Sequence, residues 1–257
     1  QQTSGHTIKA FDEDIERLRA LISQMGGLAE HAIGEAMRCL VQRDTEGALR
    51  IVENDKKLEA VENETERRGV QLIALRAPMA GDLRDVVAAL KICGVVERIG
   101  DYAKNIAKRV PLLENAGKIE ALSLMPEMAR IATEMVHDVL TALVERDSEA
   151  ALRVMKRDDA VDDFYDSIFR TLLTHMMEDP QNIGQATHLL FIAKNLERAG
   201  DHATNIAEMV YYAATGQHMT ETQTGKKPCR RNACCWSKTT VPWPNWFAST
   251  SIAPAMR

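Results

Sequence analysis

Apolar residues recur every three or four positions through most of the chain. This spacing is the period of an amphipathic α-helix, because residues three and four apart lie on one face. Asp44 and Asp147 are short polar residues at breaks in the pattern, where they suit the N-cap position of the following helix. Two further breaks contain a proline, which the interior of a helix excludes. The pattern predicts six helices, over residues 8–42, 45–76, 82–114, 126–145, 148–177 and 183–214.

The second half of the chain repeats the first. The segment LVQRDTEGALR from Leu40 aligns with LVERDSEAALR from Leu143, at an offset of 103 residues. The segment ERIGDYAKNIAKRV from Glu97 aligns with ERAGDHATNIAEMV from Glu197, at an offset of 100 residues. These copies predict an all-α fold of two tandem three-helix bundles related by internal duplication, with six long antiparallel helices in total. The predicted parts are a first bundle at 1–115, a second bundle at 116–218 and a tail at 219–257.

The tail differs in composition from the rest of the chain. Residues 226–257 hold three of the five cysteines and all three tryptophans, but no Asp or Glu, and they show no helical period. Their cysteine spacing matches no tetrahedral zinc-ligand pattern. We therefore expect a disordered tail, and we interpret Cys39 and Cys93 in the helical part as buried free thiols.

Composition and charge exclude several classes of protein. The formal net charge is −5, whereas binding to nucleic acid needs a basic surface. No apolar run approaches the roughly 18 residues that a membrane-spanning helix needs, and no segment reads as a signal peptide. These features predict a cytoplasmic protein that does not bind nucleic acid.

The third helix of each copy combines an apolar seam with a stripe of polar residues on the opposite side. Glu97, Asp101 and Asn105 step by four residues, so they form one stripe along the helix. The second copy repeats the stripe, and the second helix of each copy supplies acids that an antiparallel neighbour would set against it. These residues are Glu197, Asp201 and Asn205, then Asp55, Glu59 and Glu62 in the first copy and Asp158, Asp162 and Asp166 in the second.

Facing carboxylates repel one another unless a cation lies between them. A set of oxygen ligands suits Mg²⁺, Ca²⁺, Mn²⁺ or iron better than Zn²⁺. The alternative is a solvated acidic face, in which Arg98 pairs with Asp101 and Arg198 with Asp201 three residues on. Spacing alone leaves both interpretations open.

A glycine stands in the middle of each of these helices, at Gly100 and Gly200. Glycine inside a helix costs about 1 kcal/mol relative to alanine. Its presence beside the carboxylates in both copies predicts that a neighbouring backbone or a ligand approaches closely there.

The segments LRAPMAGDLR (75–84), ERIGDYAKNIA (97–107) and NLERAGDHATNIAE (195–208) strongly resemble PhoU, a family of bacterial accessory regulators of phosphate signalling. The resemblance covers roughly residues 8–218, in order and with the duplication, and the segment after about residue 220 departs from the family pattern. It implies a cytoplasmic all-helical homodimer that represses the phosphate-starvation response when phosphate is plentiful. It also implies two partners, the ATPase subunit of a phosphate ABC transporter and a sensor histidine kinase in the membrane.

The resemblance further implies metal binding, because some members of the family bind metal clusters through Glu/Asp-x-x-x-Asp pairs. Those pairs match Glu97–Asp101 and Glu197–Asp201 here, with Asp55–Glu59 and Asp158–Asp162 as facing partners. The metal is expected to be Mg²⁺, Mn²⁺, iron or Zn²⁺. The supporting residues around these ligands are Glu62, Arg98, Asn105, Arg198 and Asn205.

Three functions compete on this evidence. The helical part contains no nucleophile–base constellation and no Gly-rich phosphate loop, which favours a non-enzymatic adaptor without catalytic residues. A carboxylate-bridged metalloenzyme is the alternative, but ferritin-like sites use a Glu-x-x-His motif, and Gly100 and Gly200 stand where that His would be. A helical scaffold without metal or signalling role is the third.

Overall fold

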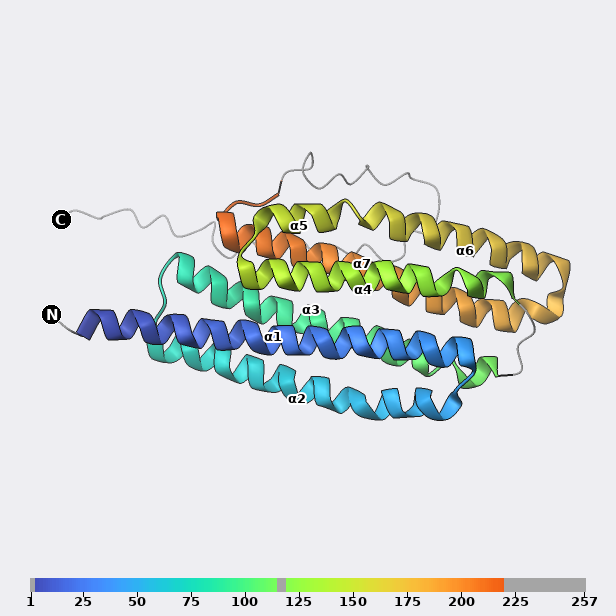
Figure 1. Ribbon diagram of the computed structural model, residues 1–257, viewed down its shortest axis with the longest axis horizontal. Coiled ribbons are helices and arrows are strands. Elements are labelled where there is room, and N and C mark those ends of the chain that lie inside the picture. The colour runs from blue at the N-terminus through green and yellow to red at the C-terminus, as the bar shows by residue number, and fades with distance from the viewer. Residues whose placement is uncertain (1–2, 115–118, 220–257) are drawn as a thin grey trace, which may run out of the picture. The chain divides into compact units, whose positions relative to one another are not determined.

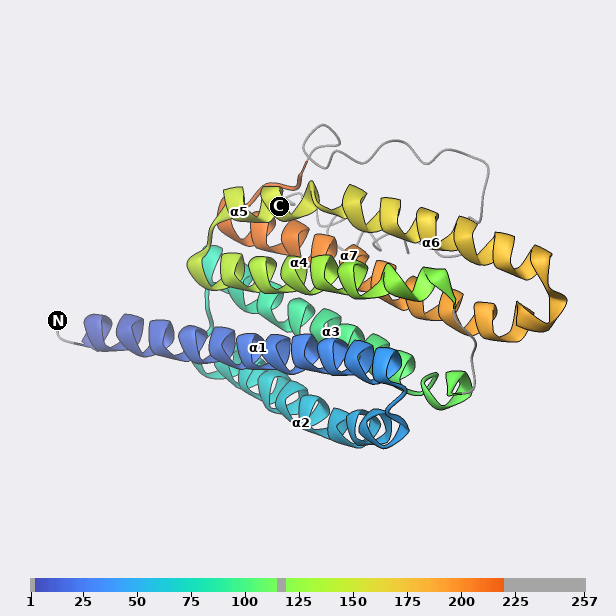
Figure 2. The ribbon, with the colours of Figure 1, turned by 45° about the vertical axis from the view of Figure 1, so that its right-hand side comes forward.

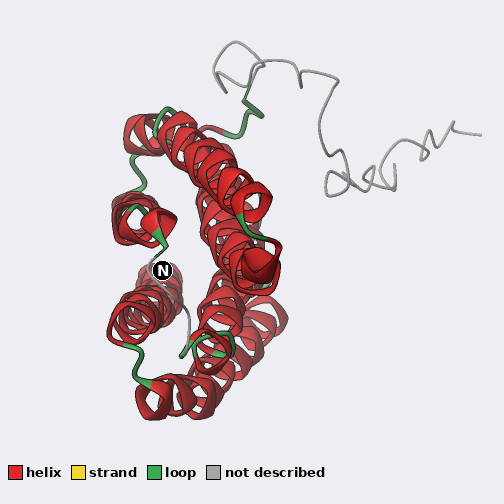
Figure 3. Cartoon of the chain, turned by 90° about the vertical axis from the view of Figure 1, so that its right-hand side faces the viewer, coloured by secondary structure: helices red, strands yellow, loops and turns green. Residues whose placement is uncertain are grey.

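The computed structural model of the protein describes residues 3–114 and 119–219, with side chains from residue 11 onward (Figure 1). These residues contain no strand, which confirms the all-α prediction (Figure 3). Short 3₁₀ turns connect some of the helices: η1 (Pro111–Leu113), η2 (Glu120–Ser123) and η3 (Pro180–Asn182). The α-helices are α1 (Thr3–Gln42), α2 (Thr45–Arg76), α3 (Gly81–Ala107), α4 (Met125–Glu145), α5 (Ser148–Met155), α6 (Asp158–Glu178) and α7 (Ile183–Thr215).

The helices pack as two bundles that share a core. Helices α1, α2 and α3 contact one another, and α7 contacts α4, α5 and α6 in the second repeat. Helix α3 packs beside α7 and α1 beside α4, as Figures 1 and 2 both show. The boundary predicted at 115/116 and the tail from residue 220 lie outside the described residues.

The apolar seams of α3 and α7 form the centre of this core. Every residue of the two predicted seams is buried, with at most 1% of its surface exposed. Burial of such side chains contributes about 25 cal/mol per Å² of apolar surface and is the main stabilising term. The seams are Ile92, Val96, Ile99, Ala103, Ile106 and Val110 on α3 and its end, and Ile192, Leu196, Ala199, Ala203, Ile206 and Val210 on α7.

Two predicted helix boundaries are wrong. The helix predicted at 82–114 ends at Ala107, and the chain continues through tighter bonds such as Val110 N–H to the Ala107 carbonyl. Pro111 explains this end, because it lacks the N–H that would bond the Ala107 carbonyl in a continuing helix. The helix predicted at 148–177 is split at Lys156 and Arg157 into α5 and α6.

The predicted N-caps are confirmed. The Asp44 carboxylate accepts a hydrogen bond from the Gly47 N–H at 2.8 Å, and Asp147 accepts from Glu149 and Ala150. These backbone bonds hold the pKa values of both carboxyl groups below their usual range. Each cap therefore fixes the start of the second helix of its repeat.

At Gly100 and Gly200 the close neighbour is a side chain of the second helix of each repeat, and not the backbone or ligand that the sequence predicted. A Cβ at Gly100 would lie 2.7 Å from Leu58 Cδ2, and one at Gly200 would lie 3.4 Å from Val161 Cγ1. Leu58 and Val161 are equivalent residues of the two repeats. The same contact is therefore built twice, but more tightly in the first repeat.

This difference predicts opposite effects for two matched substitutions. We expect Gly200→Ala to stabilise the protein by up to about 1 kcal/mol, because it removes the helical cost of glycine and meets only an ordinary contact. Gly100→Ala must displace the buried Leu58, so overpacking of about 1–3 kcal/mol outweighs the same gain. Urea unfolding of the two variants checks this, and equal stabilities would contradict it.

Candidate functional site

The carboxylates of the first repeat gather where α2 faces α3. Glu97 and Asp101 on α3 are half-buried, and the Asp55 side chain on α2 is only 10% exposed. Burial raises the pKa of Glu62 and of Glu97, and nearby carboxylates, Asp101 among them in both cases, raise it further. Burial is the larger cause of both shifts. The predicted stripe is therefore partly covered by the neighbouring helix.

A lysine occupies the centre of this cluster. Lys104 Nζ lies 2.5 Å from Asp55 Oδ2 and 3.2 Å from Asp101 Oδ1, so one ammonium bridges carboxylates of α2 and α3. The hydrogen bond from Lys104 to Asp55 is the main reason that the pKa of this lysine is raised. The cation that facing carboxylates require is thus supplied by the chain itself.

In the second repeat a different lysine pairs with the stripe, and the pair lies within one helix. Lys194 forms an ion pair with Glu197, and its Nζ lies 5.1 Å from the centre of the Tyr165 ring. Burial raises the pKa of Glu197, and Lys194 opposes that shift. Lys104 aligns with Thr204 and Lys194 with Gly94, so the two ammonium groups come from non-equivalent positions. Each repeat has its own internal counter-ion.

This arrangement does not fit a metal centre. Within residues 3–114 and 119–219, no three His, Cys, Asp or Glu side chains form a group that could hold a metal ion. An ammonium bonded to Asp55 and Asp101 occupies oxygens that a metal would need. The predicted ligand set therefore stays a prediction, and Glu59, Asp162 and Asp166 are exposed.

Of the five predicted supporting residues, some are exposed and others are half-buried. Arg98, Arg198 and Asn105 are exposed, while Asn205 and Glu62 are half-buried. In the described part of the chain neither Arg98–Asp101 nor Arg198–Asp201 forms an ion pair. In the first repeat Asp101 pairs with Lys104 instead.

Tyr102 and His202 meet where α3 packs against α7. They are equivalent residues of the two repeats, and their rings pack edge to face with centroids 5.2 Å apart. His202 Nδ1 lies 3.0 Å from the Arg198 carbonyl oxygen, which only accepts, so Nε2 is left to accept from the Tyr102 hydroxyl at 3.3 Å. Burial lowers the pKa of His202, which favours this neutral form. Both ring nitrogens are thus engaged within the protein.

A buried ion triad ties the two repeats together at another point. The Asp85 side chain on α3 is 6% exposed and lies 3.0 Å from Arg19 of α1 and 2.9 Å from Arg146 at the end of α4. Burial raises the pKa of Asp85 despite the two guanidinium groups. The sequence held a signal for this residue, because Asp85 continues the apolar seam through Ala89 and Ile92 as a lone acid.

Comparison with known proteins identifies the family to which this fold belongs. The PhoU domain profile matches the chain twice, at residues 22–110 and 125–210. The chain belongs to the PhoU family. Its two matches coincide with the two repeats described above, which explains why the fold and the carboxylate stripes occur in duplicate.

Curated PhoU relatives are similar over almost their full length. A phosphate-specific transport system accessory protein PhoU homolog of Zymomonas mobilis is 55% identical over 222 residues, which cover 86% of this chain and 94% of that protein. The corresponding homolog of Caulobacter vibrioides is 46% identical and covers 84% and 94%.

Two solved PhoU structures share the fold. PhoU from Pseudomonas aeruginosa superposes with a TM-score of 0.76 at 33% identity, covering 80% of this chain and all of that chain. The phosphate transport system regulatory protein PhoU from Streptococcus pneumoniae has the same TM-score at 27% identity and covers 82% and 99%. Among the described helices of this PhoU family member, none combines the length and apolar character needed to cross a bilayer.

Proposed function

We propose that this PhoU family member regulates phosphate transport and represses the phosphate-starvation response when phosphate is plentiful. The observation that carries the proposal is the match of both repeats to the PhoU domain, together with 94% coverage of a 55% identical relative. That relative and the Caulobacter homolog are named phosphate-specific transport system accessory proteins. The structure from Streptococcus pneumoniae is named a phosphate transport system regulatory protein.

The proposed mechanism is that of a cytoplasmic adaptor without catalytic activity. It would form a homodimer and link the ATPase subunit of a phosphate ABC transporter to a sensor histidine kinase, biasing the kinase toward dephosphorylating its response regulator. Two long helical bundles with a shared core support this role, because they offer rigid surfaces on which partners can dock.

The mechanism assigns no step to a metal ion. Each carboxylate stripe holds a lysine ammonium, Lys104 in one repeat and Lys194 in the other, and these groups compete for the oxygens that a metal would bind. The relatives are named accessory proteins and not enzymes, which supports the adaptor over the metalloenzyme alternative.

The adaptor proposal is tested by isolating complexes from the source bacterium grown in high phosphate. The full chain, carrying an affinity tag, is recovered together with membrane, and its partners are identified by mass spectrometry. We expect the transporter ATPase subunit and the kinase to be enriched, and a tag on the ATPase subunit to recover this chain in turn. Recovery of the chain with neither partner in both directions would refute the link.

A further inference from the structure

A cleft of about 240 Å³ lies between α1 and α2 in the first repeat and reaches α3 at its base. Its floor is made of small or apolar residues: Ala29, Ala32, Ile51, Leu58 and Gly100. Cavities lined in this way, with a few charged groups at the rim, are the usual form of a small-molecule site. The floor of this cleft suits a compact apolar group.

Cationic side chains outnumber acidic ones among the residues that line the cleft. Four cations face two carboxylates in its lining, and Lys57 forms no ion pair with any residue that the structure describes. Outside the lining, Asp44 pairs with Arg38 and Arg50, and Asp101 pairs with Lys104, so four carboxylates balance the four cations. The excess of positive charge is local: Arg38, Arg50 and Lys57 face only Glu35 and Asp44. The cations are Arg38, Arg50, Lys57 and Lys104, and the carboxylates are Glu35 and Asp55.

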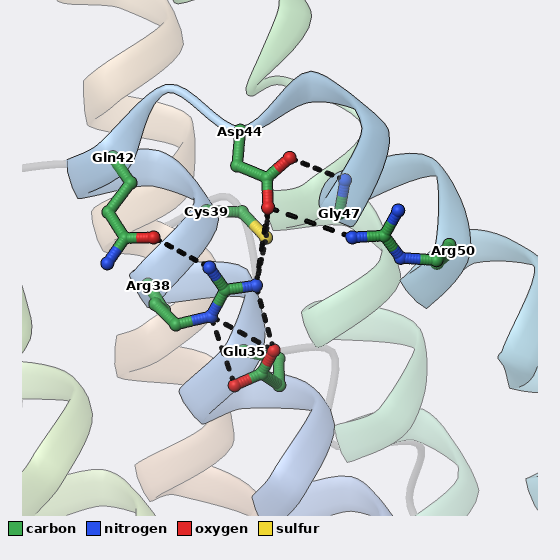
Figure 4. A network of polar contacts seen from close by, with 7 residues as sticks. All are labelled: Glu35, Arg38, Cys39, Gln42, Asp44, Gly47 and Arg50. Carbon is green, nitrogen blue, oxygen red and sulfur yellow. Dashed lines mark hydrogen bonds and ion pairs between the residues drawn. The ribbon is translucent and has the colours of Figure 1, made fainter.

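Arg38 and Arg50 approach from opposite helices, as Figure 4 shows. The Arg38 guanidinium is fixed by hydrogen bonds to Glu35 and, at 2.7 Å, to Gln42. Among the described residues Arg50 pairs with Asp44 alone, at 3.8 Å, and its side chain is 62% exposed. One guanidinium is therefore preorganised, and the other has freedom to turn toward a ligand.

The second repeat provides an internal comparison. Six of the lining residues have equivalents, at an offset of 103, that line a cleft between α4 and α5. That cleft contains no residue of α7, and its three carboxylates outnumber its two arginines. The equivalent pairs are Glu35 and Asp138, Arg38 and Thr141, Gly47 and Ala150, Arg50 and Arg153, Ile51 and Val154, and Asn54 and Arg157.

Arg157 distinguishes the lining of the second cleft from that of the first. Its guanidinium bonds Asp138 at 2.5 Å and Glu134 at 2.6 Å, so it crosses from the α5–α6 break to α4. In the first repeat Asn54 and His31 stand at the positions of Arg157 and Glu134, and no such crossing forms among the described side chains. The first cleft therefore reaches the third helix of its repeat, whereas the second, of about 400 Å³, does not and is lined by more carboxylates than cations.

We propose that the cleft between α1 and α2 of the first repeat binds a small organic anion. Its compact apolar body lies on the floor at Ala32, and its phosphate or carboxylate group is met by Arg38, Arg50 and Lys57. Guanidinium groups match both kinds of oxyanion through paired N–H donors. The site shares Asp55 and Lys104 with the carboxylate cluster, but none of the three residues that meet the anion belongs to that cluster.

The test is a titration of the purified full chain at low ionic strength, followed by calorimetry or amide NMR. Phenyl phosphate and benzoate are the probes, because they share the apolar body and distinguish phosphate from carboxylate. Phenol is the control that has the apolar body without the charge, and inorganic phosphate is the control that has the charge without the apolar body. We expect one of the two probes to bind with a dissociation constant of about 1 mM or below, and phenol and inorganic phosphate to bind about tenfold more weakly.

Matched variants locate the site. Arg50→Gln is expected to weaken binding about tenfold, whereas Arg153→Gln, at the equivalent position of the second repeat, leaves it unchanged. Ala32→Met introduces the residue found at the equivalent Met135 and is expected to abolish binding by filling the floor. No binding of either probe, or equal losses in the two arginine variants, would overturn the proposal. So would full binding by a folded Ala32→Met variant.

Discussion

Replacing Asp85 with alanine is expected to lower the free energy of unfolding by about 3–5 kcal/mol, because it leaves two arginines without their shared partner. The Arg19 side chain is only 14% exposed and loses the carboxylate that lies 3.0 Å away. Arg146 is half-exposed and can turn to water, so most of the cost falls on Arg19. A loss of this size is a large part of the stability of an ordinary domain. Urea unfolding followed by circular dichroism measures it.

Two control variants distinguish the cost of leaving a buried charge unpaired from the loss of an attractive ion pair. Asp82→Ala removes an exposed acid one turn earlier on α3 and is expected to cost less than about 1 kcal/mol. The double variant Arg19→Met with Asp85→Leu removes both charges and is expected to recover most of the stability. This follows because burial raises the pKa of Asp85 and lowers that of Arg19, which shows that desolvation exceeds their attraction. A double variant as unstable as Asp85→Ala would contradict this explanation.

Replacing Lys104 with methionine is expected to cost about 1.5–3 kcal/mol in the absence of metal, because two charge-assisted hydrogen bonds are lost and Asp55 and Asp101 then repel. The same change frees these carboxylates for a divalent cation. Mn²⁺ at ten times its dissociation constant would restore about 1.4 kcal/mol in the variant by mass action. The wild-type protein, whose lysine already fills the position, is expected to respond little.

The measurement is urea unfolding in EDTA and in Mn²⁺ for three proteins. The wild type and Lys108→Met, an exposed lysine one turn further along, should both change by less than about 0.5 kcal/mol between the two conditions. Only Lys104→Met should show a clear gain. If Mn²⁺ stabilised the wild type as strongly as the variant, the lysine would not be the counter-ion of this stripe.

The fold was accessible to sequence reasoning because its signals are local and duplicated. The seams of α3 and α7 follow directly from the spacing of apolar residues, and every residue of both is buried. Asp44 and Asp147 act as the predicted caps. The misplaced ends have local causes too: Pro111 ends α3 early, and the break before α6 coincides with Arg157 reaching across to α4.

The site was less accessible, because its chemistry depends on contacts between helices. Repulsion between facing acids indicated a cation, but spacing did not distinguish a metal from an ammonium. Lys104 has no counterpart in the second repeat and Lys194 none in the first, so a search for duplicated ligands passes over both. The cleft between α1 and α2 was missed for the same reason: its lining comes from three helices, and only six of its residues have equivalents in the cleft of the second repeat.

Repression of the phosphate-starvation response by this PhoU family member can be measured in cells. The most direct test is alkaline phosphatase activity in the source bacterium grown in high phosphate, with and without the gene. We expect high activity in the deletion strain and repression when the gene is restored, including a version ending at residue 218. Full repression in the deletion strain, with any second copy of the gene also removed, would contradict it.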